Sequence, residues 1–427
     1  MSNYSFSRLE RAYLQMQPTF GTIPNASGTA TLGNANACRF TSMELANEVA
    51  LLARPDKTGT RSQEGYIGGR KAGRWSINMA VAGNGTPGTV PDCDPILQAT
   101  FGQASTPCTS AAISITSSTG ATPIVLTTSA HTIPTGSVEV VTVANHLTNV
   151  AANGTWLAYA NSATSLTLIG SSGTGAGTAG TAARAKVSYT FVDTIAQFAL
   201  WSFRTPSTLD QRVANTCVVS EVSFALNQDV ATWSANGDCL WVLGSNSFGI
   251  ADAYQAGGLT TFPAEPSAPV TNGTIVPGFT GRFVAGSAAK NSTLASYSTA
   301  ALSFPTIRNV SIRIQTQNML VRDTFGSYYA TFSEGDVRNV SLSFNVYDDD
   351  GAAVNSLKQW ADSVTAVDFV LNLGTTPGNT WVHYLKNVYL ATSVLGDGQL
   401  RFDVSFGDSR ATASSLSVLD EYSLTIA

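Results

Sequence analysis

Large apolar residues occupy every second position in two segments that lie 265 residues apart, 75–81 and 340–346. The alternating apolar positions are Trp75, Ile77, Met79 and Val81 in the first segment, and Val340, Leu342, Phe344 and Val346 in the second. Such alternation predicts a half-buried β-strand, with one face on a core and the other face pointing outward.

The elements predicted around these two strands also follow one order. A strand near 44–53 and a polar loop through 61–71 precede the first segment, and a strand near 309–315 and a polar loop to 337 precede the second. A turn and a short helix follow in each case, with helices at 95–101 and 354–364. Closing strands are predicted at 217–226, 238–243, 384–392 and 400–406. We therefore expect a mostly β fold with two tandem sandwich or barrel units, each carrying a short helix.

Changes in composition suggest the domain boundaries. Residues 1–37 are predicted to form an N-terminal arm with a short helix near 9–15. The first unit is predicted to be discontinuous, over 38–108 and 184–244, because residues 109–183 are almost entirely Ser, Thr, Ala, Gly and Val and form an inserted small β domain. A connector with little structure is expected over 245–303, and the second unit over 304–427.

Finer expectations concern the insert and the first helix. Within the insert, strands are predicted at 123–127 and 165–168, and the glycine-rich segment 170–180 reads as a linker. Asp94 is expected to cap the first helix, and Gly102 is expected to end it.

Composition and charge narrow the functional classes. Only 12% of the 427 residues are charged, about half the usual share, while 43% are hydrophobic. That balance suits short strands and small neutral side chains on the surface. The formal net charge of -5 disfavours tight binding of nucleic acid.

The ends and the cysteines add expectations about the compartment. The first 20 residues have no continuous apolar core typical of a secretory signal, and no apolar run is long enough to span a bilayer. The five cysteines are widely spaced without a C-x-x-C pair, which favours free thiols made in a reducing cytoplasm.

The residues that carry chemistry elsewhere do not form a recognisable site here. The three histidines, His131, His146 and His383, show no triad or metal-ligand spacing. Residues 83–88 match G-x-G-x-x-G, but Pro87 and the delayed helix do not fit a dinucleotide site. We expect no enzyme activity, no cofactor and no metal.

Clusters of charge have structural explanations that compete with functional ones. The acidic run 348–350 could hold a hard cation, although a turn before a helix explains it more simply. Asp92 and Asp94 are explained in the same way. The basic residues Arg61, Arg70, Lys71 and Arg74 could contact phosphates, but a solvated hairpin or a subunit contact is the preferred interpretation.

Taken together, the chain resembles the tail tube proteins of long-tailed, siphovirus-like bacteriophages. The resemblance rests on residues 64–81, on 91–102 and on the whole second unit, while the insert resembles small β domains of phage structural proteins through 121–126 and 152–156. It implies tail-tube-type units whose strands join neighbouring copies into one barrel, and it implies self-assembly into stacked rings. It also implies a virion protein assembled in the host cytoplasm, with the tape measure, tail terminator and distal tail proteins as partners and no membrane.

The resemblance leads to specific expectations about assembly. The resemblance implies about four strands in each unit, so three copies of a two-unit chain supply 24 strands. A barrel of 24 strands has a diameter of roughly 50 Å, which passes a DNA duplex. We therefore expect a trimeric, pseudo-sixfold ring. Contacts between rings are expected from the loops 55–73 and 316–337 and from both termini. The lumen-lining candidates are Ser76, Asn78, Ala80, Ser341, Ser343 and Asn345, and the candidates for contacts between rings are Arg61, Arg70, Lys71, Arg322, Tyr328 and Tyr329.

Two other functions remain open from the sequence. A distal tail or tail-tip subunit would use the same fold in a single ring. A carbohydrate-binding adhesin would present exposed aromatic residues such as Trp156 or Tyr159 from the insert.

Overall fold

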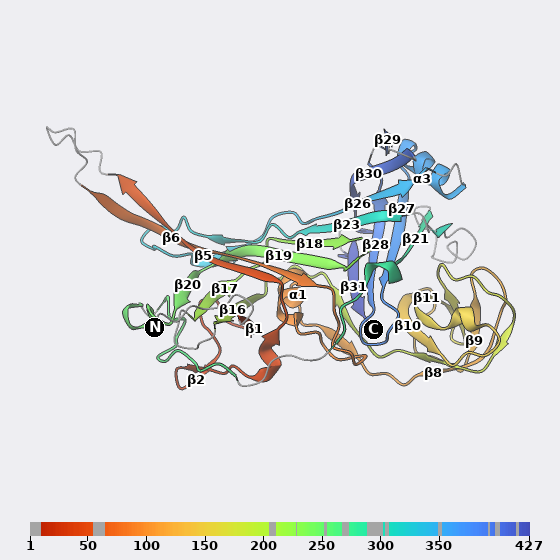
Figure 1. Ribbon diagram of the computed structural model, residues 1–427, viewed down its shortest axis with the longest axis horizontal. Coiled ribbons are helices and arrows are strands. Elements are labelled where there is room, and N and C mark those ends of the chain that lie inside the picture. Colours follow the sequence, from red (N-terminus) through yellow and green to blue (C-terminus); the bar gives the residue numbers. More distant parts are fainter. Residues whose placement is uncertain are drawn as a thin grey trace.

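The protein is mostly β, as the sequence predicts (Figure 1), with 52% of residues in strands and 8% in helices. The computed structural model describes residues 10–427 except 54–64, 205–210, 228, 252–253, 267–272, 288–301, 304–306, 349–351, 392, 398–401 and 416–417.

One large sheet runs through both predicted units. Eight of its strands follow one another in the spatial order β5-β6-β19-β18-β23-β26-β30-β29. Their bounds are Ser42–Ala53 (β5), Tyr66–Ala80 (β6), Thr232–Cys239 (β19), Glu221–Leu226 (β18), Ile307–Gln315 (β23), Asn339–Tyr347 (β26), Phe402–Ala411 (β30) and Ser393–Asp397 (β29). The second alternating segment falls in β26, and the first falls in β6 except for Val81, which follows it directly, so both strand predictions are confirmed.

The two halves of this eight-strand region repeat one arrangement. In the first half, β5 pairs with β6, β6 with β19 and β19 with β18. In the second half, β23, β26, β30 and β29 occupy the same places in the same chain order. A helix follows the second strand of each half, α1 (Asp94–Phe101) after β6 and α3 (Ala352–Asp362) after β26. The two halves meet where β18 pairs with β23.

A separate five-stranded sheet packs beneath the first half. Its order is β20-β17-β16-β1-β4, with bounds Trp241–Gly244, Arg212–Cys217, Gln197–Phe203, Arg11–Gln17 and Ala37–Cys38. The helix predicted near 9–15 is wrong, because Arg11–Gln17 is a strand. Leu14 contacts one core and Tyr13 contacts another, so both faces of β1 are buried. A strand buried on both faces lacks alternation and is easily mistaken for a helix.

The second half has its own covering layer. It consists of β22 (Leu302–Ser303), β21 (Arg282–Ser287), β27 (Ala366–Leu373), β28 (Trp381–Tyr389), β31 (Tyr422–Ile426), β15 (Lys186–Thr190) and β7 (Thr106–Cys108). The connector 245–303 is thus more ordered than expected, since β21 within it pairs with β27 over six residues. Strand β27 is buried along its whole length.

The insert folds as a closed barrel of six strands, β8-β14-β10-β11-β12-β9, in which β9 pairs back to β8. These strands are Ile113–Ser118, Thr181–Ala183, Val138–Ala144, Gly154–Ser162, Ser165–Leu168 and Val125–Thr128. The glycine-rich segment 170–180 is not a loose linker: it contains β13 (Gly177–Thr178), and the buried Ser171 hydroxyl accepts a bond from the Ile124 amide at 2.8 Å.

The ends of α1 show one prediction confirmed and one wrong. Gly102 ends the helix with a φ of 80°, a left-handed conformation that favours glycine. Asp94 does not cap the helix, because Cys93 occupies the cap position. The Asp94 carboxylate instead accepts a bond from the buried Tyr189 hydroxyl at 2.7 Å, and burial raises the pKa of Asp94.

Short elements complete the chain. The hairpins are β2 (Asn25–Ala26) with β3 (Thr29–Ala30), and β24 (Met319–Val321) with β25 (Phe332–Glu334). Single 3-10 turns lie at Asn34–Asn36, Val150–Ala152, Phe248–Ile250 and Gly278–Thr280.

Candidate functional site

The six lumen-lining candidates lie on one face of the eight-strand region. Strand register connects them across the whole face: Asn78 is opposite Ser234, Ser234 is opposite Ser223, Ser223 is opposite Arg313, and Arg313 is opposite Ser341. A second row runs in parallel through Ala80, Thr232, Ala225, Ser311 and Ser343. Residues on one row share a face because side chains alternate along each strand. We call this surface the polar face.

The opposite side of the same strands forms the core. Trp75, Ile77 and Met79 of β6 and Leu342 and Phe344 of β26 belong to one hydrophobic cluster. Burying these apolar residues fixes which side of the strands points outward, since a slip of one residue would expose the whole set.

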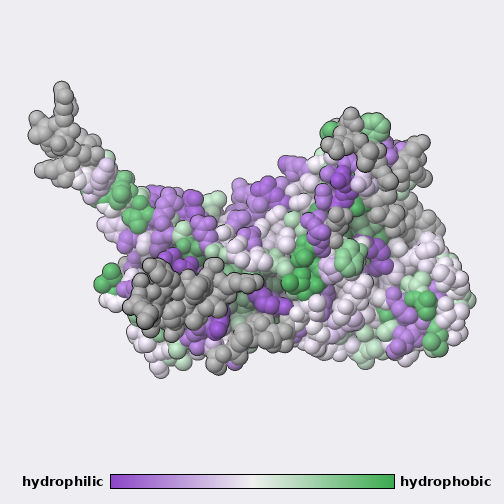
Figure 2. Space-filling view, viewed as in Figure 1, coloured by the Kyte–Doolittle hydropathy of each residue, from purple (hydrophilic) through white to green (hydrophobic). Residues whose placement is uncertain are grey.

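Figure 2 shows hydrophilic side chains gathered along the upper rim of the molecule, and this rim is concave between the β5–β6 hairpin and the region of α3. One candidate differs from expectation. Ser341 is only 6% exposed, and its cross-strand neighbours are Arg313 and Arg410. At this position the two arginines, and not Ser341, form the outer surface of the polar face.

Four arginines on the described polar face are paired with carboxylates. Arg313 bonds Glu221 at 2.6 Å, Arg308 bonds Asp403 at 2.6 Å, Arg74 lies 3.3 Å from Glu48 and Arg410 lies 3.2 Å from Asp408. The hydrogen bond that Arg313 donates to Glu221 raises the pKa of Arg313. Exposed pairs of this kind add little stability. Their effect on the polar face is to offset each positive charge where it could attract a phosphate.

The candidates for contacts between rings fall into two groups. Arg61 lies outside the described residues. Lys71, Tyr329 and Arg322 are engaged within the chain: the Lys71 ammonium donates to the Tyr329 hydroxyl at 3.0 Å, and Arg322 lies 3.4 Å from Asp238. Arg70 and Tyr328 are exposed.

The projecting part of the β5–β6 hairpin carries a feature that the sequence analysis missed. Five large apolar side chains there are exposed, namely Val49, Leu51, Leu52, Tyr66 and Ile67. Figure 1 shows this hairpin extending away from the body of the molecule. Exposed apolar residues grouped in this way are typical of a surface that meets another protein.

The three histidines lie apart in the structure. His383 is buried beside Phe224 and Trp381, and its Nδ1 lies 2.7 Å from the Tyr422 hydroxyl. Burial lowers the pKa of His383 to about 3. His146 contacts the Ser118 hydroxyl through Nε2 inside the insert. In the described part of the chain, no three His, Cys, Asp or Glu side chains are grouped as a metal site would require.

The other chemical candidates have structural roles. Gly83 lies where a Cβ would meet the Gly378 carbonyl oxygen at 2.0 Å, so the glycine run allows two loops to cross closely. Asp92 accepts a bond from the Arg39 guanidinium at 2.7 Å, and Asp348 accepts one from Lys358 at 2.7 Å. The remaining carboxylates of the acidic run, 349–350, lie outside the described residues.

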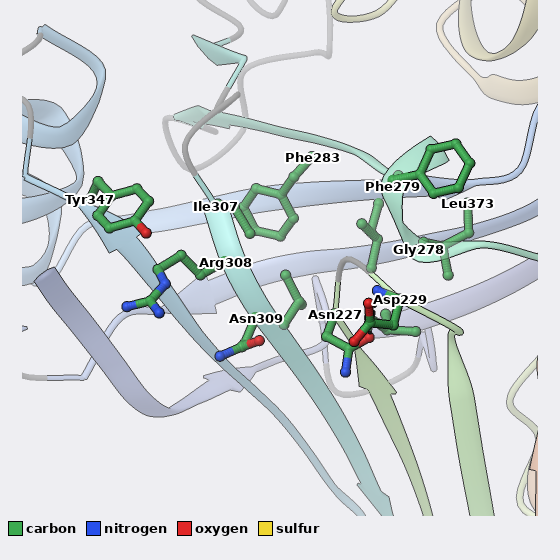
Figure 3. Close-up of a pocket in the computed structure, with 14 residues that line it drawn as sticks. Asn227, Asp229, Gly278, Phe279, Phe283, Ile307, Arg308, Asn309, Tyr347 and Leu373 are labelled. Atoms are coloured by element: carbon green, nitrogen blue, oxygen red, sulfur yellow. Dashed lines mark hydrogen bonds between the residues drawn. The ribbon is translucent and has the colours of Figure 1, made fainter.

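A cavity of about 540 Å³ opens where β18 and β23 approach β21 and β27 (Figure 3). Phe283 and Leu371 supply apolar walls, and Asn227 and Asn309 supply amides. Arg308 lies on one side of the cavity, where Asp403 holds it over the Tyr347 ring. The lining is therefore a mixture of amides and apolar groups at the open end of a β-sandwich.

The aromatic residues proposed for sugar binding are not exposed. Trp156 and Tyr159 are both buried. The Arg282 guanidinium lies 3.5 Å from the centre of the Trp156 ring, and Tyr159 packs with Val370 and Tyr384 of the second half. These residues attach the insert to the rest of the chain.

No protein-family model matches the chain, and no curated protein matches it in sequence. Among the described residues, no helix is both long and apolar enough to cross a bilayer.

Proposed function

We propose that this chain is a structural subunit of a phage tail tube, which closes into rings that stack into a hollow conduit for DNA. The observation that carries the proposal is the polar face: eight consecutive strands of which the six inner ones, β6 to β30, have one side in the core and carry small neutral side chains and paired charges on the other side. The function itself follows from the resemblance and from this surface.

Strand number supports the size of the ring. Eight strands per chain give 24 strands in three copies, and a barrel of that size has a diameter of roughly 50 Å, wide enough for a DNA duplex after side chains are added. Six copies would double the strand number and leave an over-wide pore. The repeated order of the two halves would then give a trimer with pseudo-sixfold symmetry.

The polar face suits passage rather than binding. A cation that neutralises a DNA phosphate releases counterions and strengthens binding, so unpaired basic residues in the lumen would slow the movement of DNA. Here four arginines of the described face are offset by Glu221, Asp403, Glu48 and Asp408. DNA would pass transiently without tight binding.

Partners and location follow from the same proposal. The chain would be a virion protein of the tail, assembled in the host cytoplasm, with the tape measure, tail terminator and distal tail proteins as neighbours. Contacts between stacked rings would involve the exposed Arg70 and Tyr328 and the apolar hairpin residues. The insert lies away from the polar face in Figure 1, on the outside of such a tube.

The test is negative-stain electron microscopy of the concentrated, purified chain, with mass measurement of any soluble species. Hollow tubes or stacked rings built from trimers are expected. A closed ring that never stacks would instead favour a distal tail or tail-tip subunit. A chain that remains monomeric at every concentration, with and without a tail-tip initiator, would contradict both hypotheses.

A further inference from the structure

The junction between the two halves is a β-sheet interface that the chain makes with itself. Strand β18 of the first half pairs antiparallel with β23 of the second. Ala225 lies opposite Ser311, and Leu226 lies opposite Val310. Leu226 is only 6% exposed, so this pairing completes the core on one side of the sheet.

Each half has two edge strands, and among the described residues one of the two has no strand on its outer side. In the described chain, β5 and β29 pair only with β6 and β30, respectively. By their place in the repeated order, β29 corresponds to β18 and β5 corresponds to β23. The outer edges of β29 and β5 are therefore the two halves of a second junction of the same kind.

Register identifies the corresponding residues. Ser42 is opposite Asn78 as Ser311 is opposite Ser343, and Asn78 and Ser343 hold equivalent places in β6 and β26. On the other edge, Val394 is opposite Ser405, which is opposite Asn345. Ala225 is opposite Thr232, which is opposite Ala80. Ser42 thus corresponds to Ser311, and Val394 corresponds to Ala225.

We propose that β29 of one copy pairs antiparallel with β5 of the next copy, in the register of the β18–β23 junction, with Val394 opposite Ser42 and Leu395 opposite Thr41. The proposal rests on the proposed function, because it specifies the surface through which the ring closes. It makes the interface head-to-tail, so each copy contributes both edges and the ring has no free edge.

Exposure of the edge residues agrees with a missing partner. Leu395, the counterpart of Leu226, is 61% exposed, although it lies on the core side opposite Val404. Met43 corresponds to the fully buried Ile312, yet it is only partly buried. A second copy placed on these edges would cover Leu395 and Met43, as the β18–β23 junction covers their counterparts Leu226 and Ile312.

Disulfide cross-linking tests the register. In the double variant Ser42→Cys and Val394→Cys, directly opposite Cα atoms would lie within disulfide range, and oxidation should link most chains into covalent trimers. The matched control is Ala225→Cys with Ser311→Cys, the corresponding internal pair, which should form a disulfide within one chain. A shifted pair, Glu44→Cys with Val394→Cys, should cross-link only at background level.

The outcomes separate this proposal from the proposed function. If rings form but the shifted pair cross-links as well as the predicted pair, the edge pairing is overturned. The same holds if rings form and Ser42→Cys with Val394→Cys gives no cross-link. Ring assembly would stand in both cases. Covalent ladders longer than three chains would support the pairing but contradict a trimeric ring. Absence of any ring, with the internal control disulfide formed, would overturn both.

Discussion

Ser223 of β18 lies directly opposite Arg313 of β23, and this pair joins the two halves of the chain into one sheet. Arg313 also lies opposite Ser341 of β26 and bonds Glu221 at 2.6 Å. The row that crosses the junction therefore contains a basic residue whose charge is offset within the chain. Because the junction pairs β18 with β23 without a register shift, the polar face continues from the first half into the second.

Basic substitutions on the polar face should slow the passage of DNA. Ser343→Arg and Asn345→Arg each add one cation to every copy, and each new cation can neutralise a phosphate. We expect tubes to assemble and ejection of DNA from assembled particles to become slower, with recovery at higher salt. The control is Val150→Arg in the insert, at a residue 66% exposed. Unchanged ejection in both polar-face variants would show that this face does not line the lumen.

Removing a compensating carboxylate should have a related effect without adding a basic residue. Glu221→Gln leaves Arg313 without its ion-pair partner. We expect slower ejection at low salt, and we expect the second substitution Arg313→Gln to restore the original rate. Ejection kinetics measured across a salt series in the single and double variants provide the check. Failure of the double variant to recover would mean that Glu221 acts through something other than the charge of Arg313.

Much of the fold follows from alternation alone. Residues 75–81 and 340–346 were predicted as strands with the correct buried face, because each has an apolar residue at every second position. The pattern could not predict the pairing of β18 with β23, because alternation within a strand does not specify which strand it pairs with. The helix expected near 9–15 failed for a different reason, namely that both faces of β1 are buried.

The buried histidine should make stability depend on pH. Burial lowers the pKa of His383 to about 3 in the folded chain, against 6.5 for an ordinary histidine. As the pH falls below about 6.5 the unfolded chain gains a proton that the folded chain does not, so stability is lost by about 1.4 kcal/mol per pH unit. His383→Gln should remove this contribution, about 2 kcal/mol between pH 6.5 and pH 5.

Urea unfolding of the unassembled chain at pH 6.5 and pH 5 measures the effect. The diagnostic quantity is the difference between the two pH values, because His383→Gln also alters the contact with Tyr422. Equal pH dependence in the original and the variant would contradict a neutral, buried His383.

The insert should detach when its docking residue is shortened. Leu157 lies on the outer side of the barrel and packs with Val370, Val382 and Tyr384 of the second half. Leu157→Ala should reduce stability by about 2–4 kcal/mol and increase proteolysis near the insert boundaries, because the lost contacts leave a cavity. Leu147→Ala, at an exposed leucine of the same barrel, should change stability by less than about 0.5 kcal/mol. Equal effects of the two variants would show that the insert is not held by this surface.

The candidate surface was only partly accessible from sequence. Ser76, Asn78 and Ser343 were identified because they alternate with core residues on a single strand. The ion pairs of Arg313 with Glu221 and of Arg308 with Asp403 could not be predicted from the sequence. Their members lie 92 and 95 residues apart and meet only through strand pairing. Burial of Trp156 was also invisible, since it comes from the interior of the insert barrel and from Arg282, which lies in another part of the chain.

The most direct test of the account is a cryo-electron microscopy reconstruction of the assembled tube, resolved well enough to trace strands. We expect three chains per ring, a continuous wall of about 24 strands, and Asn78, Ser223 and Ser343 facing the lumen. A wall in which the side of the sheet carrying these residues faces outward, or a ring of six chains with 24 strands drawn from only half of each polar face, would contradict it.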